Sequence, residues 1–338
     1  MLYAMNDLKC AVLAVKYSIS PYFDLVAICP DIAMQQPLLR PPSAVLSTFE
    51  GFSRRALLVQ AISFAALSAC PNAAVASVDP FFERLRARYI LMRPGETMFE
   101  AADIVDSNPI NKGDNFRGLT TKGQQQVIET SQRLRALNVD PTAVFYDNGA
   151  RASQTADILS RELKIPRARM EPEFRWLEGR GLGALEGTSL REALAKTRQM
   201  DREDIDNAAE PAEDGTPADS VNDVFSRMRN TIAKIEQTYG AGDFIIIPGD
   251  STVLSVFASA ACGCDLREHA KFELPPGSFY DLSQVVRDYQ AGSFTPIEPT
   301  VPSPEEILAG RERLRREGPS IFATSEAGSW VLGPGVRR

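Results

Sequence analysis

The stretch Tyr89-Ile90-Leu91-Met92-Arg93-Pro94-Gly95-Glu96-Thr97 decides the fold of this chain. Its first four residues are apolar, which predicts a buried strand of a parallel sheet, and the residues after them predict a loop at the end of that strand. Two further apolar runs have the same character, Ala143-Val144-Phe145-Tyr146 and Phe244-Ile245-Ile246-Ile247. Turn-forming residues follow each of them. We therefore expect three strands in the middle of one sheet.

Segments with helical spacing separate these strands. Thr120 or Thr121 is a suitable N-cap for the first of them, because a threonine hydroxyl can accept a hydrogen bond from a backbone N–H of the first turn. The expected helices cover residues 121–137, 152–163, 221–239 and 252–261. Strands that alternate with helices of this length predict a three-layer α/β/α domain with a mainly parallel central sheet.

The region N-terminal to this domain has the features of a targeting signal. Arg54-Arg55 opens an uncharged apolar run to Ala69, and Ala74-Val75-Ala76 provides a small-residue cleavage site. We expect residues 1–76 to be a targeting region, a transit peptide followed by a twin-arginine-type signal for the thylakoid lumen of a chloroplast. The apolar run is about 14 residues long, and a transmembrane helix needs roughly 20. Export, or anchoring in a membrane by residues 54–69, is the alternative.

The remaining chain divides into a domain over residues 77–295 and a C-terminal region over residues 296–338. The domain includes an acidic insertion at about 200–220, which we expect to be solvated. A Pro-rich linker leads to Ser303-Pro304-Glu305-Glu306, which predicts the start of a short charged helix that ends near Arg316. The formal net charge of −7 and the lack of a basic stripe argue against a nucleic-acid partner.

Charged residues follow each of the three expected strands. Arg93 follows the first strand, Arg151 comes shortly after the second, and Asp250 follows the third, while Glu178 lies in a glycine-rich stretch between them. Open α/β sheets bind ligands at the carboxyl ends of their strands. Two arginines that converge there form a clamp suited to phosphate. Ion pairs of these arginines with Glu178 or Asp250 are the alternative.

Five segments, in order along the chain, resemble motifs of the histidine phosphatase superfamily, which includes the phosphoglycerate mutases. They are Arg93-Pro94-Gly95-Glu96-Thr97, Leu119-Thr120 with Gly123, Arg151-Ala152-Ser153-Gln154-Thr155-Ala156, Gly183-Ala184-Leu185-Glu186-Gly187, and Gly249-Asp250. The resemblance covers residues 89–282. It implies a phosphoglycerate mutase-like fold in which Arg93 and Arg151 bind phosphate.

The two catalytic histidines of that family are replaced in this chain. The resemblance places them at Pro94 and Pro248, and proline has neither a nucleophilic nor an acid–base group. Glu178 approximates the general acid of the family, although one extra residue separates it from the glycine-rich loop that follows. Glu100 stands where many members carry asparagine, and its carboxylate would repel an anion if it pointed into the site.

The single histidine of the chain, His269, lies in a segment that reads as a surface connection. We expect it to be a bystander, either hydrogen-bonded or exposed, because it follows the helix after the third strand. A mechanism that needs two histidines is therefore excluded. The sequence shows no metal-ligand spacing and no cofactor motif, since the cysteines of the domain, Cys262 and Cys264, have no zinc-ligand companions.

Three functions are compatible with these residues. The first is an inactive relative of the phosphatases that keeps a two-arginine anion site and binds a phosphorylated small molecule or a protein partner. The second is a slow phosphomonoesterase, in which Arg93 and Arg151 hold the phosphate and Glu178 or Asp250 activates water. The third is a structural or assembly factor that docks through the acidic segment or the C-terminal helix.

Overall fold

The computed structural model describes residues 79–173, 177–298, 301–318, 322–324 and 330–332. The expected targeting region, residues 1–76, lies outside the described residues. Strands of the main sheet are β1 (Arg88–Met92), β2 (Ala143–Asp147), β3 (Met170–Glu173), β4 (Phe244–Pro248) and β5 (Phe279–Asp281). The α-helices are α3 (Met98–Ala101), α4 (Thr121–Ala136), α5 (Ala150–Leu163), α6 (Leu190–Glu203), α7 (Val221–Thr238), α8 (Ser251–Cys262), α9 (Leu282–Gln290) and α10 (Pro304–Glu317).

The sheet has the strand order β3-β2-β4-β1-β5. Its first four strands are parallel, and β5 pairs with β1 in the antiparallel direction. In the register of β1 and β4, Met92 lies beside Pro248, so the loops that follow both strands begin at the same edge of the sheet. A second, two-stranded pairing joins β6 (Phe322–Thr324) to β7 (Trp330–Leu332).

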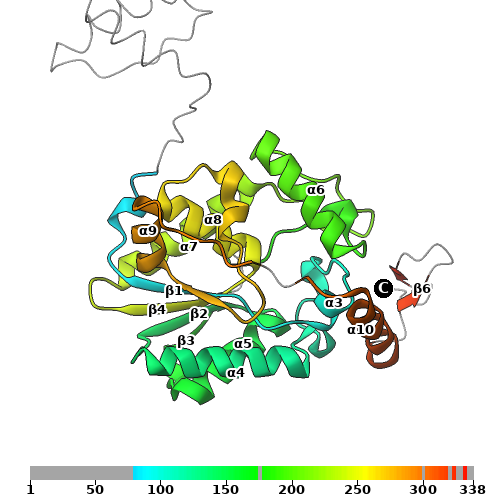
Figure 1. Ribbon diagram of the computed structural model, residues 1–338, viewed down its shortest axis with the longest axis horizontal. Helices are drawn as coiled ribbons and strands as arrows, with labels where there is room; N and C mark the ends of the chain where they lie inside the picture. Colours follow the sequence, from blue (N-terminus) through cyan, green and yellow to red (C-terminus); the bar gives the residue numbers. More distant parts are fainter. Residues whose placement is uncertain (1–78, 174–176, 299–300, 319–321, 325–329, 333–338) are drawn as a thin grey trace, which may run out of the picture. The chain divides into compact units, whose positions relative to one another are not determined.

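Alternate residues of the strands face two hydrophobic cores. Tyr89 and Leu91 belong to the core formed with α7, α8 and α9, whereas Ile90 and Met92 belong to the core formed with α4 and α5. Each residue of this strand segment is at most 1% exposed, because helices cover both faces of the sheet. This arrangement is the expected three-layer α/β/α fold with a mainly parallel sheet (Figure 1).

Local signals placed most of these elements correctly. The hydroxyl of Thr120 accepts a hydrogen bond from the N–H of Gly123 and caps α4. Ser303 and Glu306 form a reciprocal capping box at the start of α10, as expected from the sequence. The pattern did not reveal β3, which is short, polar and contains Pro172, or β5, which has three residues. Edge strands of this kind lack the apolar run that marks a central strand.

The acidic segment is only partly the solvated insertion that we expected. Its first residues complete α6, and Asp201 is 1% exposed. Thr216 and Ser220 are also buried. Most of the acidic side chains between Asp201 and Ser220 remain at the surface. Among the described residues, no helix combines the length and the apolar character that a membrane crossing requires.

Candidate functional site

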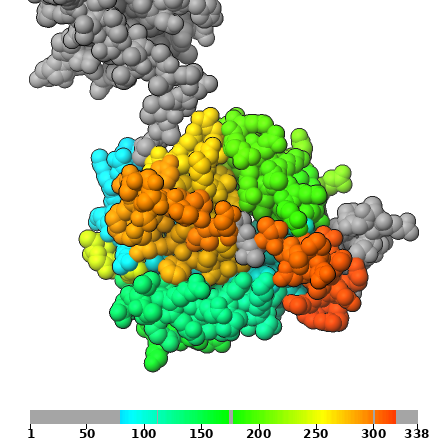
Figure 2. Space-filling model, in the orientation of Figure 1, coloured from blue at the N-terminus to red at the C-terminus, as the bar shows by residue number. Residues whose placement is uncertain are grey.

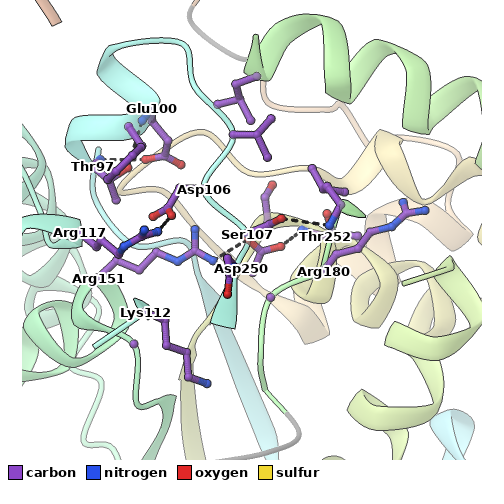
Figure 3. Close-up of a pocket in the computed structure, with 18 of the residues that line it drawn as sticks. Thr97, Glu100, Asp106, Ser107, Lys112, Arg117, Arg151, Arg180, Asp250 and Thr252 are labelled. Carbon is purple, nitrogen blue, oxygen red and sulfur yellow. Dashed lines mark hydrogen bonds and ion pairs between the residues drawn. The ribbon is translucent and has the colours of Figure 1, made fainter. Parts of the chain in front are cut away.

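A pocket of about 110 Å³ opens at the carboxyl ends of β1, β2 and β4. All four residues expected at the site, Arg93, Arg151, Glu178 and Asp250, line it. Figure 3 shows two of them, Arg151 and Asp250. The structure therefore brings together side chains from four separate segments. Pockets that bind small organic molecules are typically about 300–1,000 Å³, so this one is small.

Arg93 leaves the end of β1 and contacts two acceptors. Its Nη2 atom donates a hydrogen bond to Glu100 Oε1 at 2.7 Å, and its Nη1 atom donates to the carbonyl oxygen of Leu274 at 2.6 Å. The other carboxylate oxygen of Glu100 accepts a hydrogen bond from the N–H of Thr97 at 2.8 Å and so caps α3. Glu100 thus points into the site, and its carboxylate lies where an anion would meet Arg93.

Arg151 extends from the first turn of α5 toward the start of α8. Its Nη2 atom donates to Asp250 Oδ2 at 3.1 Å, while Asp250 Oδ1 accepts from the N–H of Thr252 at 2.9 Å (Figure 3). Burial acts to lower the pKa of Arg151, but the nearby carboxylates, of which Asp250 is the strongest, raise it above its ordinary value. Asp250 therefore neutralises Arg151 and occupies the positive end of α8.

Three cations in the pocket, Lys112, Arg117 and Arg180, were not identified from the sequence. Lys112 Nζ lies 2.6 Å from Glu178 Oε1 and 2.9 Å from Asp147 Oδ1, so Glu178 pairs with a lysine and not with either predicted arginine. Arg117, 6% exposed, forms an ion pair with Asp106. The only hint of Arg117 in the sequence was its position shortly before Leu119-Thr120, where α4 begins. No rule of sequence spacing predicts the ion pairs of Lys112 or of Arg117.

Arg117 also lies against two neighbouring aromatic rings. Its guanidinium carbon lies 5.1 Å from the ring centroid of Phe99 and 5.4 Å from that of Phe116. Burial, together with the positive charge of Arg151, lowers the pKa of Arg117, although Glu186 partly offsets this effect. Stacking and burial together give this side chain a fixed place in the wall of the pocket.

Pro94 and Pro248, where the resemblance places the catalytic histidines of the family, are buried and do not line the pocket. The carbonyl oxygen of Pro94 accepts a hydrogen bond from the N–H of Gly277 at 2.9 Å. The N–H of Gly249, next to Pro248, donates to the carbonyl oxygen of Met92 at 3.0 Å. Both loops are therefore part of the packed sheet edge and keep their backbone hydrogen bonds without histidine.

Gly95 is required for this packing. A Cβ atom at this position would lie 2.0 Å from the carbonyl oxygen of Gly123, in the first turn of α4. The loop after β1 and the start of α4 approach so closely that only glycine fits on either side. This glycine therefore serves the geometry of the backbone.

Charge pairing is the main feature of the pocket. Each described cationic side chain in its wall has a carboxylate partner. These pairs are Arg93–Glu100, Lys112–Asp147 and Lys112–Glu178, Arg117–Asp106, Arg151–Asp250 and Arg180–Asp201. The pocket is therefore neutralised internally, and any ligand anion must compete with carboxylates of the protein.

The single histidine lies apart from this pocket. His269 is 2% exposed, so it is not on the surface, and it lies within a buried chain of contacts. Its Nδ1 atom is 2.8 Å from Ser255 Oγ, and its Nε2 atom is 3.2 Å from Asp201 Oδ2. Asp201 also accepts two hydrogen bonds from Arg180, at 2.7 and 2.8 Å. His269 is the hydrogen-bonded bystander that the sequence indicated, but in the core.

The family model described as "Histidine phosphatase superfamily (branch 1)" matches residues 89–292, more than half of the chain. Among solved structures, a mycobacterial glucosyl-3-phosphoglycerate phosphatase is similar, with 17% identity and a TM-score of 0.45 over 57% of this chain and 90% of that one. The α-ribazole phosphatase from Shigella flexneri is similar with 20% identity and a TM-score of 0.44, over 57% and 88%. No curated protein matches the chain in sequence.

Proposed function

Because the chain belongs to the histidine phosphatase superfamily but carries proline at both catalytic histidine positions, we propose that it binds a phosphorylated ligand without turning it over. The observation that carries this proposal is the convergence of Arg93 and Arg151 on one pocket. A guanidinium group has five N–H donors, and among the described residues Arg151 uses only Nη2 in a side-chain contact. Donors therefore remain for the oxygens of a phosphoryl group.

Binding without turnover follows from what the pocket contains. A phosphohistidine intermediate requires a histidine at the phosphate, and the only histidine of the chain is bound to Ser255 and Asp201 in the core. A mutase requires the same intermediate, because it must return the phosphoryl group to the substrate. The retained arginines supply electrostatic attraction to the ligand, but the described residues that line the pocket include no histidine.

Direct attack by water is less well supported than binding. It would need Glu178 or Asp250 as the general base, and such assistance is worth roughly 10²–10⁴ in rate. Asp250 already accepts hydrogen bonds from Arg151 and Thr252, and Glu178 lies 2.6 Å from the Lys112 ammonium. Both carboxylates are therefore already engaged by donors of the protein itself.

The pairing of every described cation in the pocket favours a second function, a structural or assembly role with no ligand in this pocket. The ion pairs would then hold the four site segments together. A protein that acts in this way should be indifferent to phosphate. The two functions therefore differ in one measurable quantity, the affinity for an anion.

The proposal is tested by isothermal titration calorimetry of the full chain with inorganic phosphate. We expect binding that weakens roughly tenfold to a hundredfold in Arg151→Ala, since hydrogen bonds to charged groups are worth about 1.5–3 kcal/mol. Arg267→Ala is the matched control, because Arg267 pairs with Asp265 outside the pocket. Phosphate that fails to bind would support the structural role. Turnover of a phosphomonoester that disappears in Arg151→Ala would show a histidine-free enzyme.

A further inference from the structure

The C-terminal helix α10 lies beyond the part of the chain that the family model matches, residues 89–292, and packs against α3. It rests on the surface of the domain (Figure 2). Leu314 is 1% exposed and shares a small hydrophobic cluster with Phe99, Ala102 and Ile104. The helix is therefore an addition that is fixed at the site end of the domain.

Close backbone contact fixes α10 to the end of α3. A Cβ atom at Gly310 would lie 2.1 Å from the carbonyl oxygen of Ala101, so a larger residue does not fit there. One residue on, Arg311 Nε donates a hydrogen bond to the carbonyl oxygen of Ala102 at 3.0 Å. This contact satisfies a carbonyl group at the end of a helix of only four residues.

The same short helix carries Glu100, whose carboxylate forms the ion pair with Arg93. One oxygen of Glu100 accepts the hydrogen bond from Arg93, and the other accepts from the N–H of Thr97 in the capping box. Because both oxygens are engaged, the position of Glu100 follows the position of α3. A shift of α3 would move the carboxylate away from the guanidinium.

We propose that α10 is a positioning element that holds Glu100 on Arg93 and so keeps the anion site occupied by the protein's own carboxylate. This inference rests on the proposed phosphate binding. A phosphoryl group that approaches Arg93 Nη2 meets the negative charge of Glu100, which already accepts a hydrogen bond from that nitrogen, and the contact of Gly310 and Arg311 with α3 holds the carboxylate in place. Loosening α10 should therefore strengthen phosphate binding.

A gain of affinity separates this role from simple structural support. A residue that only stabilises the fold would weaken ligand binding, or leave it unchanged, when it is mutated. The experiment compares Gly310→Leu, which forces α10 away from Ala101, with Glu100→Gln, which removes the competing charge. Leu308→Ala is the matched control, because Leu308 lies on the same helix and is 65% exposed.

Each full-length variant is titrated with inorganic phosphate by calorimetry, and hydrogen exchange of residues 304–317 reports whether α10 has moved. We expect roughly tenfold tighter binding in Gly310→Leu and in Glu100→Gln, and unchanged binding in Leu308→Ala. A variant that combines Gly310→Leu with Glu100→Gln should bind phosphate no more tightly than Glu100→Gln alone, because both changes act on the contact between Glu100 and Arg93. Arg311→Ala provides a milder release if Gly310→Leu does not fold.

Two results would overturn the inference in distinguishable ways. Faster exchange in α10 with unchanged affinity, while Arg151→Ala still abolishes binding, would leave phosphate binding intact and reject the role of α10. Absence of phosphate binding in every variant, Glu100→Gln included, would reject both. Binding that is detected only in the released variants would support the role of α10 and show that the wild-type pocket does not bind phosphate.

Discussion

Two arginine–carboxylate pairs begin at the wall of the pocket, but water reaches only one of them, because Arg180 lines the pocket and pairs with Asp201 in the core. The side chains of Arg151 and Asp250 are 28% and 21% exposed, whereas those of Arg180 and Asp201 are 4% and 2% exposed. A ligand can replace a partner in the first pair, because water and the ligand can both reach it. The second pair cannot open without leaving a bare charge in the core.

The largest expected effect is on the buried pair. Asp201→Ala should lower the free energy of unfolding by about 3–5 kcal/mol, because it leaves Arg180 without its carboxylate. Asp250→Ala should cost about 1–2 kcal/mol, mainly through loss of the N-cap of α8. Urea denaturation of the two variants measures the difference. Equal losses would show that burial does not distinguish the two regions.

A smaller effect should appear in the pH dependence of stability. Burial alone would raise the pKa of Asp201, but hydrogen bonds from His269 and Arg180 outweigh it and lower the pKa below its ordinary value of 3.8. A lowered pKa means that Asp201 contributes stability above pH 3.8 and loses this contribution as the pH falls through its folded value.

The measurement is the difference in unfolding free energy between the wild type and Asp201→Asn as the pH is lowered. We expect this difference to be constant near neutral pH and to shrink below pH 3.8. Other carboxylates titrate in both proteins and cancel in the comparison. A difference that stays constant down to the acid unfolding transition would contradict the assigned role of Asp201.

The smallest effect, on phosphatase activity, is expected from substitutions of Pro94 and Pro248. The double variant Pro94→His and Pro248→His should show no turnover of p-nitrophenyl phosphate, because neither position lines the pocket and both arginines are paired with carboxylates. Adding Glu100→Gln to this double variant makes the test more stringent, because it removes the ion pair between Glu100 and Arg93. Turnover by the double variant alone would mean that the ion pairs do not keep phosphate out.

Much of the fold could be predicted because its signals are local. The apolar runs of β1, β2 and β4 mark central strands, and the hydroxyls of Thr120 and Ser303 mark helix starts within three residues of the groups they cap. β3 and β5 could not be found in this way. They lie at the edges of the sheet, where fewer neighbours demand apolar side chains.

The candidate site was predictable in its membership but not in its pairing. Motif order placed Arg93, Arg151, Glu178 and Asp250 at one edge of the sheet, and the pocket contains all of them. The pairing of Glu178 with Lys112 joins residues that are 66 positions apart, and nothing local in the sequence indicates it.

The amino-acid sequence alone indicated the α/β architecture, the segments that reach the site and the proline residues at positions 94 and 248. Only the tertiary structure decided that Glu100 turns toward Arg93, that Asp201 leaves the acidic segment for the core, and that α10 packs on α3. The reason is physical. Periodicity and capping act over a few residues, whereas the partner of a charge depends on which distant segments the folded chain brings within hydrogen-bonding distance.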